Sequence, residues 1–124
     1  MAIRSTQLTT AVYVDATIAN GASLSGAVEL KGYALTALII PAEWDTATVA
    51  TFNLSVDGST YYNLYHDVSG TLTEYSVPVA ASRYIALDAT KFMGVQYIKV
   101  RAGTAGAASN QTGATVVTLV CFPV

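Results

Sequence analysis

The sequence predicts an all-β protein, an antiparallel β-sandwich of about eight strands. Apolar and polar residues alternate with a period of two, the period of strands, in several stretches, and helical periodicity is nearly absent. Glycine, asparagine, aspartate or proline separates these stretches about every ten residues. Such spacing favours antiparallel strands over alternating βαβ units. It leaves jelly-roll and immunoglobulin-like topologies both open.

The clearest element is a hairpin in the middle of the chain. Residues 50–56 are apolar at every even position and polar at every odd one. Asp57-Gly58 follows, and glycine tolerates the positive φ that a tight turn needs. The aromatic-rich stretch 61–66 is predicted to be the returning strand.

The remaining strands follow the same pattern less cleanly. They are expected at 12–18, 25–30, 33–40, 71–79, 83–87, 95–101 and 115–122. The even-numbered residues of the first are predicted to face inward. The stretch 33–40 is apolar on both faces, which predicts a strand that is central or covered, and Pro41 ends it because proline has no donor for the ladder.

Two stretches depart from the strand pattern. Residues 88–93 are predicted to form one short helical turn, with Asp88 as its N-cap. The stretch 102–113 is rich in small and polar residues and is expected to be a long exposed loop. We expect an N-terminal arm at 1–10, a single β-sandwich domain at 11–124, and an apolar anchoring tail at 120–124.

Composition excludes several kinds of protein. Charged residues make up 11% of the 124 residues, against about 25% in typical domains. Six scattered lysines and arginines make no basic patch, so no nucleic-acid partner is expected. No stretch has the length of a membrane span or of a signal-peptide core, and we expect a protein made in the cytoplasm with no membrane partner. A single cysteine allows no internal disulfide.

Residues suited to catalysis are scarce. His66 is the only histidine, and on a strand its neighbour Asp67 would point to the opposite face. Cys121 alternates with apolar residues and is expected to be buried. Four acids are expected at turns, where backbone hydrogen bonds account for them: Asp45, Asp57, Asp67 and Asp88. A calcium site built from separate loops stays open. We predict no enzyme activity, no catalytic residue, no cofactor and no metal ligand.

What remains is a surface for interaction. Its candidate residues are Trp44, Tyr61, Asn63 and Tyr65. The hairpin places the last three on one face, opposite Leu64, which must belong to the core, so Tyr62 is predicted to be buried with Leu64. Trp44 either joins the outward tyrosines or plugs the end of the sandwich. Such residues suit a sugar ring and a protein interface equally, and ordinary cross-strand aromatic pairs are the plain alternative.

Five segments occur in a distinctive order. They read GASLSGAVELKG at 21–32, IPAEW at 40–44, FNLSVDGSTYYNLY at 52–65, RYIALD at 83–88 and YIKVRAG at 97–103. Together they resemble a family of small β-sandwich proteins encoded among the structural genes of tailed bacteriophages. The resemblance implies a virion protein of the head decoration or cement type, with the major capsid protein and copies of itself as partners. No site residue is carried over from that family.

The low charge fits this role, because a neutral surface loses its hydration cheaply and many weak contacts add on a symmetric shell. Two alternatives remain. One is a carbohydrate-binding module of a phage tail or fibre that uses Trp44, Tyr61 and Tyr65. The other is a tail or adaptor subunit that forms rings.

Overall fold

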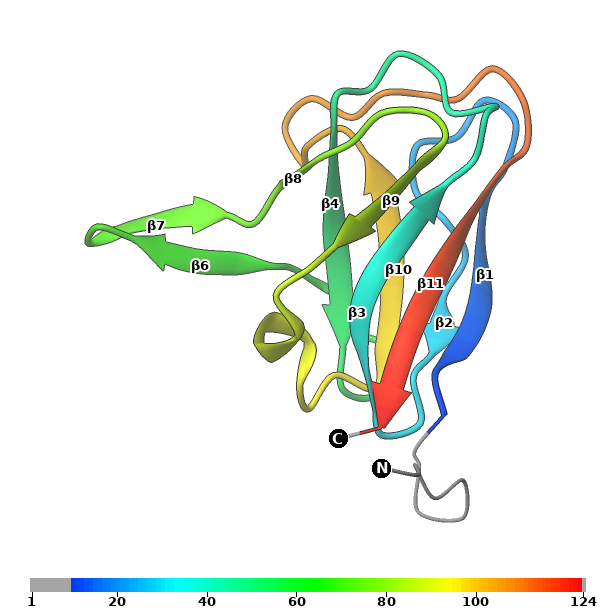
Figure 1. Cartoon of the computed structure of the whole chain (residues 1–124). Coiled ribbons are helices and arrows are strands. Elements are labelled where there is room, and N and C mark those ends of the chain that lie inside the picture. Colours follow the sequence, from blue (N-terminus) through cyan, green and yellow to red (C-terminus); the bar gives the residue numbers. More distant parts are fainter. Residues whose placement is uncertain (1–9, 124) are drawn as a thin grey trace, which may run out of the picture.

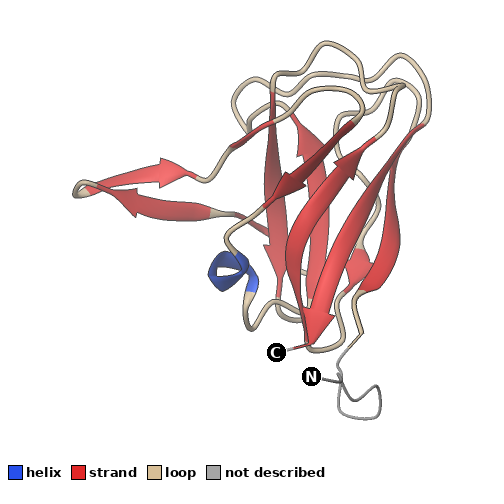
Figure 2. Cartoon of the chain, viewed as in Figure 1, coloured by secondary structure: helices blue, strands red, loops and turns tan. Residues whose placement is uncertain are grey.

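The computed structural model describes residues 10–123, which form two packed antiparallel sheets and a hairpin that projects from them (Figure 1). The all-β prediction is confirmed, and the helical content of residues 10–123 is the single turn η2 (Ala89–Phe92) visible in Figure 2. Asp88 caps this turn by accepting a hydrogen bond from Thr90 N at 3.1 Å, as predicted. The predicted arm at 1–10 falls outside the described residues except for Thr10.

The first sheet has the strand order β1-β11-β3-β9. Its strands are β1 (Val12–Ile18), β11 (Thr115–Pro123), β3 (Tyr33–Ile40) and β9 (Arg83–Ala86). The predicted strand at 33–40 is confirmed, and it lies inside the sheet between two partners. Residues 120–123 belong to β11, which pairs on both sides, so the expectation of an anchoring tail is wrong for them.

The second sheet has the order β2-β10-β4-β5, with β8 also paired to β4. Its strands are β2 (Val28–Glu29), β10 (Tyr97–Ala102), β4 (Val49–Ser55), β5 (Tyr62–Asn63) and β8 (Val77–Pro78). The predicted β4–β5 hairpin is confirmed. Its turn uses Gly58 at φ 81°, where a Cβ atom would also lie 3.1 Å from the Tyr97 ring.

The described residues form eleven strands, two more than the nine stretches expected above, because two of the predicted strands are interrupted. The stretch 61–66 breaks at Leu64, and 71–79 breaks at Tyr75, whose N–H donates to the Leu64 carbonyl at 2.9 Å. Both side chains pack against the core. Beyond this junction the chain continues as the third sheet, the hairpin of β6 (Tyr65–Val68) and β7 (Thr71–Glu74).

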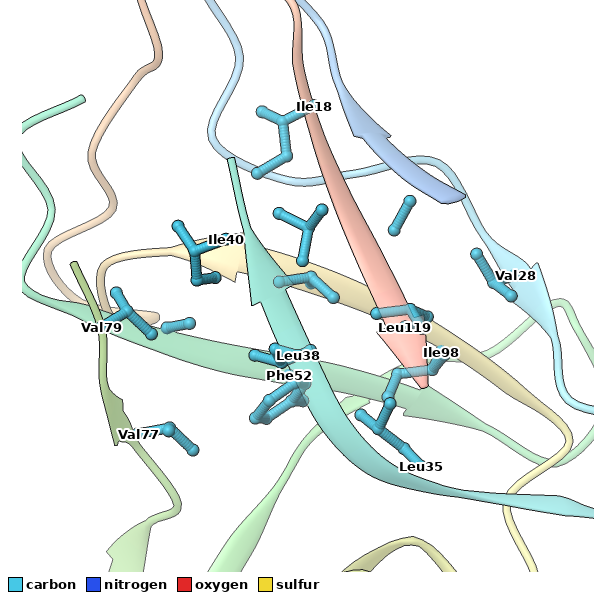
Figure 3. Close-up of a cluster of buried hydrophobic side chains, with 14 of the residues drawn as sticks. Ile18, Val28, Leu35, Leu38, Ile40, Phe52, Val77, Val79, Ile98 and Leu119 are labelled. Carbon is cyan, nitrogen blue, oxygen red and sulfur yellow. The ribbon is translucent and has the colours of Figure 1, made fainter. Parts of the chain in front are cut away.

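The core lies between the inner faces of the two sheets (Figure 3). Leu38 and Leu119 of the first sheet and Phe52 and Ile98 of the second are fully buried there. Phe52 also meets Phe92 of η2 edge to face, with ring centroids 5.0 Å apart. Inward alternation is confirmed at the middle of the strands.

Alternation does not guarantee burial at strand ends. The even-numbered residues of β1 run from fully buried Ile18 to Val12, which is 37% exposed. In the same way, Ala50 and Phe52 are buried while Val56, just past the end of β4, is 71% exposed. Val12 lies on the inner side of β1, as predicted, since it pairs with buried Cys121, but it borders an open hollow that Val14 and Leu30 also line and is therefore only partly buried.

Candidate interaction surfaces

Trp44 does not belong with the tyrosines of the hairpin. It is 7% exposed, packs with the core, and donates its Nε1–H to the Ala47 carbonyl at 2.8 Å. The β3–β4 loop that holds it lies at the opposite end of the sandwich from the β4–β5 turn (Figure 1). Of the two placements that the sequence allowed, the structure shows the second, in which Trp44 fills the end of the sandwich.

Two of the three predicted hairpin residues are occupied by internal contacts. Tyr61 is half-buried, and the Lys99 Nζ atom lies 4.3 Å from the centre of its ring. Asn63 Oδ1 accepts hydrogen bonds from Asn53 Nδ2 at 2.9 Å and from Arg101 Nη2 at 3.0 Å. Tyr65 is 47% exposed and presents its ring to solvent.

Tyr62 is exposed, contrary to its prediction. It pairs with Leu54 and so shares the core-facing side of the sheet, yet 65% of its surface is open. The reason is an open hollow of about 390 Å³ at the β5 edge. Its lining includes Leu54, Tyr62, Leu64, Tyr65 and Met93, and none of its lining residues is charged. We call this the edge hollow.

The outer face of the first sheet is the second exposed apolar region. Four exposed large side chains lie on it: Tyr13, Tyr84, Val116 and Phe122. The register places them in rows with other outward residues, for example Tyr13 beside Val120 and Tyr84 beside Ile39. Asp15 is the one charged residue among the outward, paired positions of this sheet. We call this the apolar face.

The outer face of the second sheet has the opposite character. Arg101 is buried there, with Nη1 3.4 Å from Glu74 Oε2 and 3.3 Å from Thr51 Oγ1. Both Glu74 carboxylate oxygens also accept from Ala105 N–H at 3.2 Å. No buried side-chain nitrogen or oxygen of the described residues lacks a hydrogen-bond partner. This face is polar and satisfied from within the chain, whereas the apolar face is not covered by any described element.

One feature of the sequence indicated the apolar face. The stretch 33–40 is apolar on both sides, which predicts a strand that is central or covered. Its inner side chains, such as Leu38, meet the core, while Ile39 and Ala37 lie on the outer side beside β9. The full face could not be found from the sequence, because it depends on which four strands pair and in which register.

The residues with reactive side chains stay apart from one another. His66 packs edge to face on Tyr75, with ring centroids 5.1 Å apart, while Asp67 pairs with Leu72 on the other face of the hairpin. Asp67 lies within β6, so its expected place in a turn is wrong. Cys121 is 1% exposed, as predicted, and burial raises the pKa of its thiol to about 11.

The other acids are held as turn residues. Asp57 accepts from the backbone N–H groups of Ser59 and Thr60, and these bonds lower the pKa of its carboxyl. Hydrogen bonds from Thr90 lower the pKa of Asp88 in the same way. Asp45 accepts from the Thr112 hydroxyl at 2.8 Å. Within residues 10–123, no three histidine, cysteine or acidic side chains are grouped as a metal site would need.

Gln111 is a structural residue that the sequence did not indicate. It lies in the predicted long loop and yet is 1% exposed. Its Oε1 accepts from Asp45 N at 2.8 Å and its Nε2 donates to the Asp45 carbonyl at 2.9 Å. This one amide therefore joins the β10–β11 loop to the β3–β4 loop. No periodicity marks such a residue, because its partner is distant in the chain.

Comparison with known proteins adds no family to this description. No family model matches the chain, and no curated protein or solved structure matches it either. Among the described residues, no helix has the length and apolar character needed to cross a membrane.

Proposed function

We propose that the protein is a non-enzymatic bacteriophage virion protein, a decoration or cement protein that stabilises the head by laying its apolar face on the capsid shell. The observation that carries the proposal is the apolar face itself. It presents Tyr13, Tyr84, Val116 and Phe122 with a single charge, and no described element of the chain covers it. The order of sequence segments that resembles phage structural proteins supports the same role.

The size of the apolar face suits attachment in many copies. Four strands about 4.8 Å apart, with about six residues each at 3.4 Å, span roughly 400 Å². A stable interface between two proteins buries about 800 Å² on each partner. One such face therefore gives weak binding when alone. On a symmetric shell, further contacts between neighbouring copies raise the total affinity.

The test is co-sedimentation with heads of the phage that encodes the chain, prepared without this protein. Wild-type protein should sediment with the heads. Tyr84→Lys and Val116→Lys should weaken binding tenfold or more, because each buries a charge in an apolar contact. Thr60→Lys is the matched control, since Thr60 is exposed in the β4–β5 turn away from this face. Wild-type protein that stays in the supernatant would overturn the proposal.

A second candidate function rests on the edge hollow. Tyr62 and Tyr65 are 65% and 47% exposed and both line it, together with Asn63. Two exposed tyrosine rings suit stacking on a sugar ring, as in a carbohydrate-binding module of a tail or fibre. A glycan array followed by titration tests this. Tyr62→Ala and Tyr65→Ala should each abolish binding, and unchanged affinity in both would exclude the hollow as a glycan site.

A further inference from the structure

Strand β1 (Val12–Ile18) forms one edge of the first sheet (Figure 1). It has seven residues, its only charge is Asp15, and it contains neither lysine nor proline, which commonly protect exposed edges from pairing. The other edge strands of the two packed sheets are shorter: β9 has four residues, and β2, β5 and β8 have two each. β9 also contains Arg83, and β8 contains Pro78. Among the edges of the two packed sheets of residues 10–123, β1 is therefore the longest and the least protected.

Two contacts show which backbone groups of β1 point away from the sheet. In an antiparallel ladder the N–H and C=O of one residue point to the same side, and those of the next residue point to the opposite side. The Thr17 carbonyl accepts from Gly26 N–H at 3.2 Å, outside the ladder with β11. Val120, which lies opposite Tyr13, directs its carbonyl toward β3, where it accepts from Thr36 Oγ1 at 2.9 Å. The odd-numbered residues of β1 thus direct their backbone groups to the open edge.

The N–H and C=O groups of Tyr13 and Asp15 are the free groups of this edge. No loop or side chain of residues 10–123 is hydrogen-bonded to these four groups. The inner side of the edge is open as well. Half-buried Val14 and Val12, which is 37% exposed, border a hollow of about 340 Å³ that Leu30 also lines. An added strand would pair the four backbone groups and cover these two valines.

We propose that β1 of a second copy is this added strand, paired antiparallel about a two-fold axis at Val14. Only odd-numbered residues face the edge, so an odd-numbered residue must lie opposite an odd-numbered one. With Val14 opposite Val14, Tyr13 lies opposite Asp15 of the second copy, and all four groups of each copy are paired. An axis at Asp15 would bring two like charges opposite each other, which is unfavourable. An axis at Tyr13 would require Ala11, which lies outside β1, to pair with Asp15.

A second copy fits this edge because β1 is complementary to itself in that register. On the inner side, Val12 lies opposite Ala16 and Val14 opposite Val14, so every cross-strand pair is apolar. On the outer side, Tyr13 lies opposite Asp15, so no like charges meet. The odd-numbered residues of both copies point to the same side, and the two first sheets become one continuous sheet.

The paired edge by itself is small. Seven residues at 3.4 Å each make an edge roughly 24 Å long, whereas a standard interface uses about 20–30 residues on each side. Dimers are therefore weak in solution and depend on concentration. Pairing also joins the two apolar faces into one of roughly 800 Å², the area that a stable interface buries on each partner. This last consequence rests on the proposed function, whereas the pairing itself does not.

Disulfide trapping of the full chain tests the pairing and its register. Each variant carries Cys121→Ala, because Cys121 lines the same hollow as Val14. Under mild oxidation we expect Val14→Cys to form dimers several-fold faster than Tyr13→Cys or Asp15→Cys. At the two-fold axis the Cα atoms lie about 4.5 Å apart, whereas the diagonal 13–13 and 15–15 pairs lie about 7–8 Å apart, too far for a disulfide. Tyr84→Cys, exposed on β9 at the opposite edge, is the matched control for random collision. Each rate is divided by the reaction rate of the same thiol with a small reagent, so that differences in exposure do not count.

A proline at the edge gives a second measurement. Asp15 N–H faces away from β11, so Asp15→Pro keeps the ladder of the folded chain, which circular dichroism checks. In the Val14→Cys background it should lower the dimer yield several-fold, while Asp15→Ala leaves the yield unchanged. Dimers of Val14→Cys no faster than those of Tyr84→Cys, dimers formed mainly at 13 or 15, or a yield that Asp15→Pro does not change would each overturn the proposal. The oxidation uses free protein and head binding is measured separately, so the two proposals can fail independently.

Discussion

The ion pair between Arg101 and Glu74 allows a direct measurement of how firmly the β6–β7 hairpin is anchored to the second sheet. Glu74 is the last residue of β7, and Arg101 lies in β10 of the second sheet. Their side chains are 16% and 11% exposed, and the closest N–O distance is 3.4 Å. Glu74→Ala leaves the guanidinium buried with the neutral partners Asn63 and Thr51.

The expected magnitude follows from this geometry. Removing one partner of a fully buried pair costs about 3–5 kcal/mol. The partial exposure and the 3.4 Å distance reduce this, so Glu74→Ala should lower the free energy of unfolding by about 2 kcal/mol. In an Arg101→Met background the same change should cost about 1 kcal/mol or less. There it removes only the acceptor for Ala105 N–H.

Urea unfolding of the wild type, both single variants and the double variant gives the coupling energy as a double-mutant cycle. We expect a coupling of about 1 kcal/mol or more. Asp67→Ala is the matched control, because it removes an exposed carboxylate from the same β6–β7 hairpin. It should change the free energy of unfolding by less than about 0.5 kcal/mol. A coupling below about 0.3 kcal/mol would refute the reasoning, because the two side chains would then act independently.

Three further predictions concern the sandwich itself. Gln111→Met leaves the Asp45 N–H without its partner and removes one of the two donors to the Asp45 carbonyl, and it should cost about 1–3 kcal/mol in urea unfolding, whereas Thr112→Ala nearby should cost under about 1 kcal/mol. Cys121, with its pKa raised from 9.0 to about 11, should react with a thiol reagent at pH 8 only on unfolding, and stability should fall as pH rises between these values. The pKa of Asp57 is lowered from 3.8, so its contribution is lost as pH falls below that value, and Asp57→Asn should flatten the acid loss of stability.

The fold class and the main strands could be predicted because they depend on local patterns. Alternation over 50–56 and the unbroken apolar stretch 33–40 identify β4 and β3 without knowledge of any partner. Asp57-Gly58 marks the turn between β4 and β5 because its backbone needs a positive φ. Asp88 marks the start of η2 for a similar local reason, the need for an N-cap.

The site was harder to predict because exposure depends on the facing sheet. Alternation correctly places Tyr62 on the side of Leu54, but it does not say that an open hollow borders Tyr62 there. Trp44 had two placements, and only the packing of the loops decides between them. Gln111 and Arg101 are buried polar residues whose partners lie far away in the chain, so no local pattern identifies them.

The few charged residues of the chain are distributed unequally between the outer faces of the two sheets. Arg101 and Lys99 are on the outer face of the second sheet, where hydrogen bonds and the Tyr61 ring occupy them. The outer face of the first sheet has Asp15 alone among its outward, paired positions. Successive residues of β3 point to opposite faces, and both Leu38 and Ile39 are apolar. A two-layer sandwich covers one of these faces and leaves the other open, and this open face is the surface that the proposed contact with a capsid shell would cover.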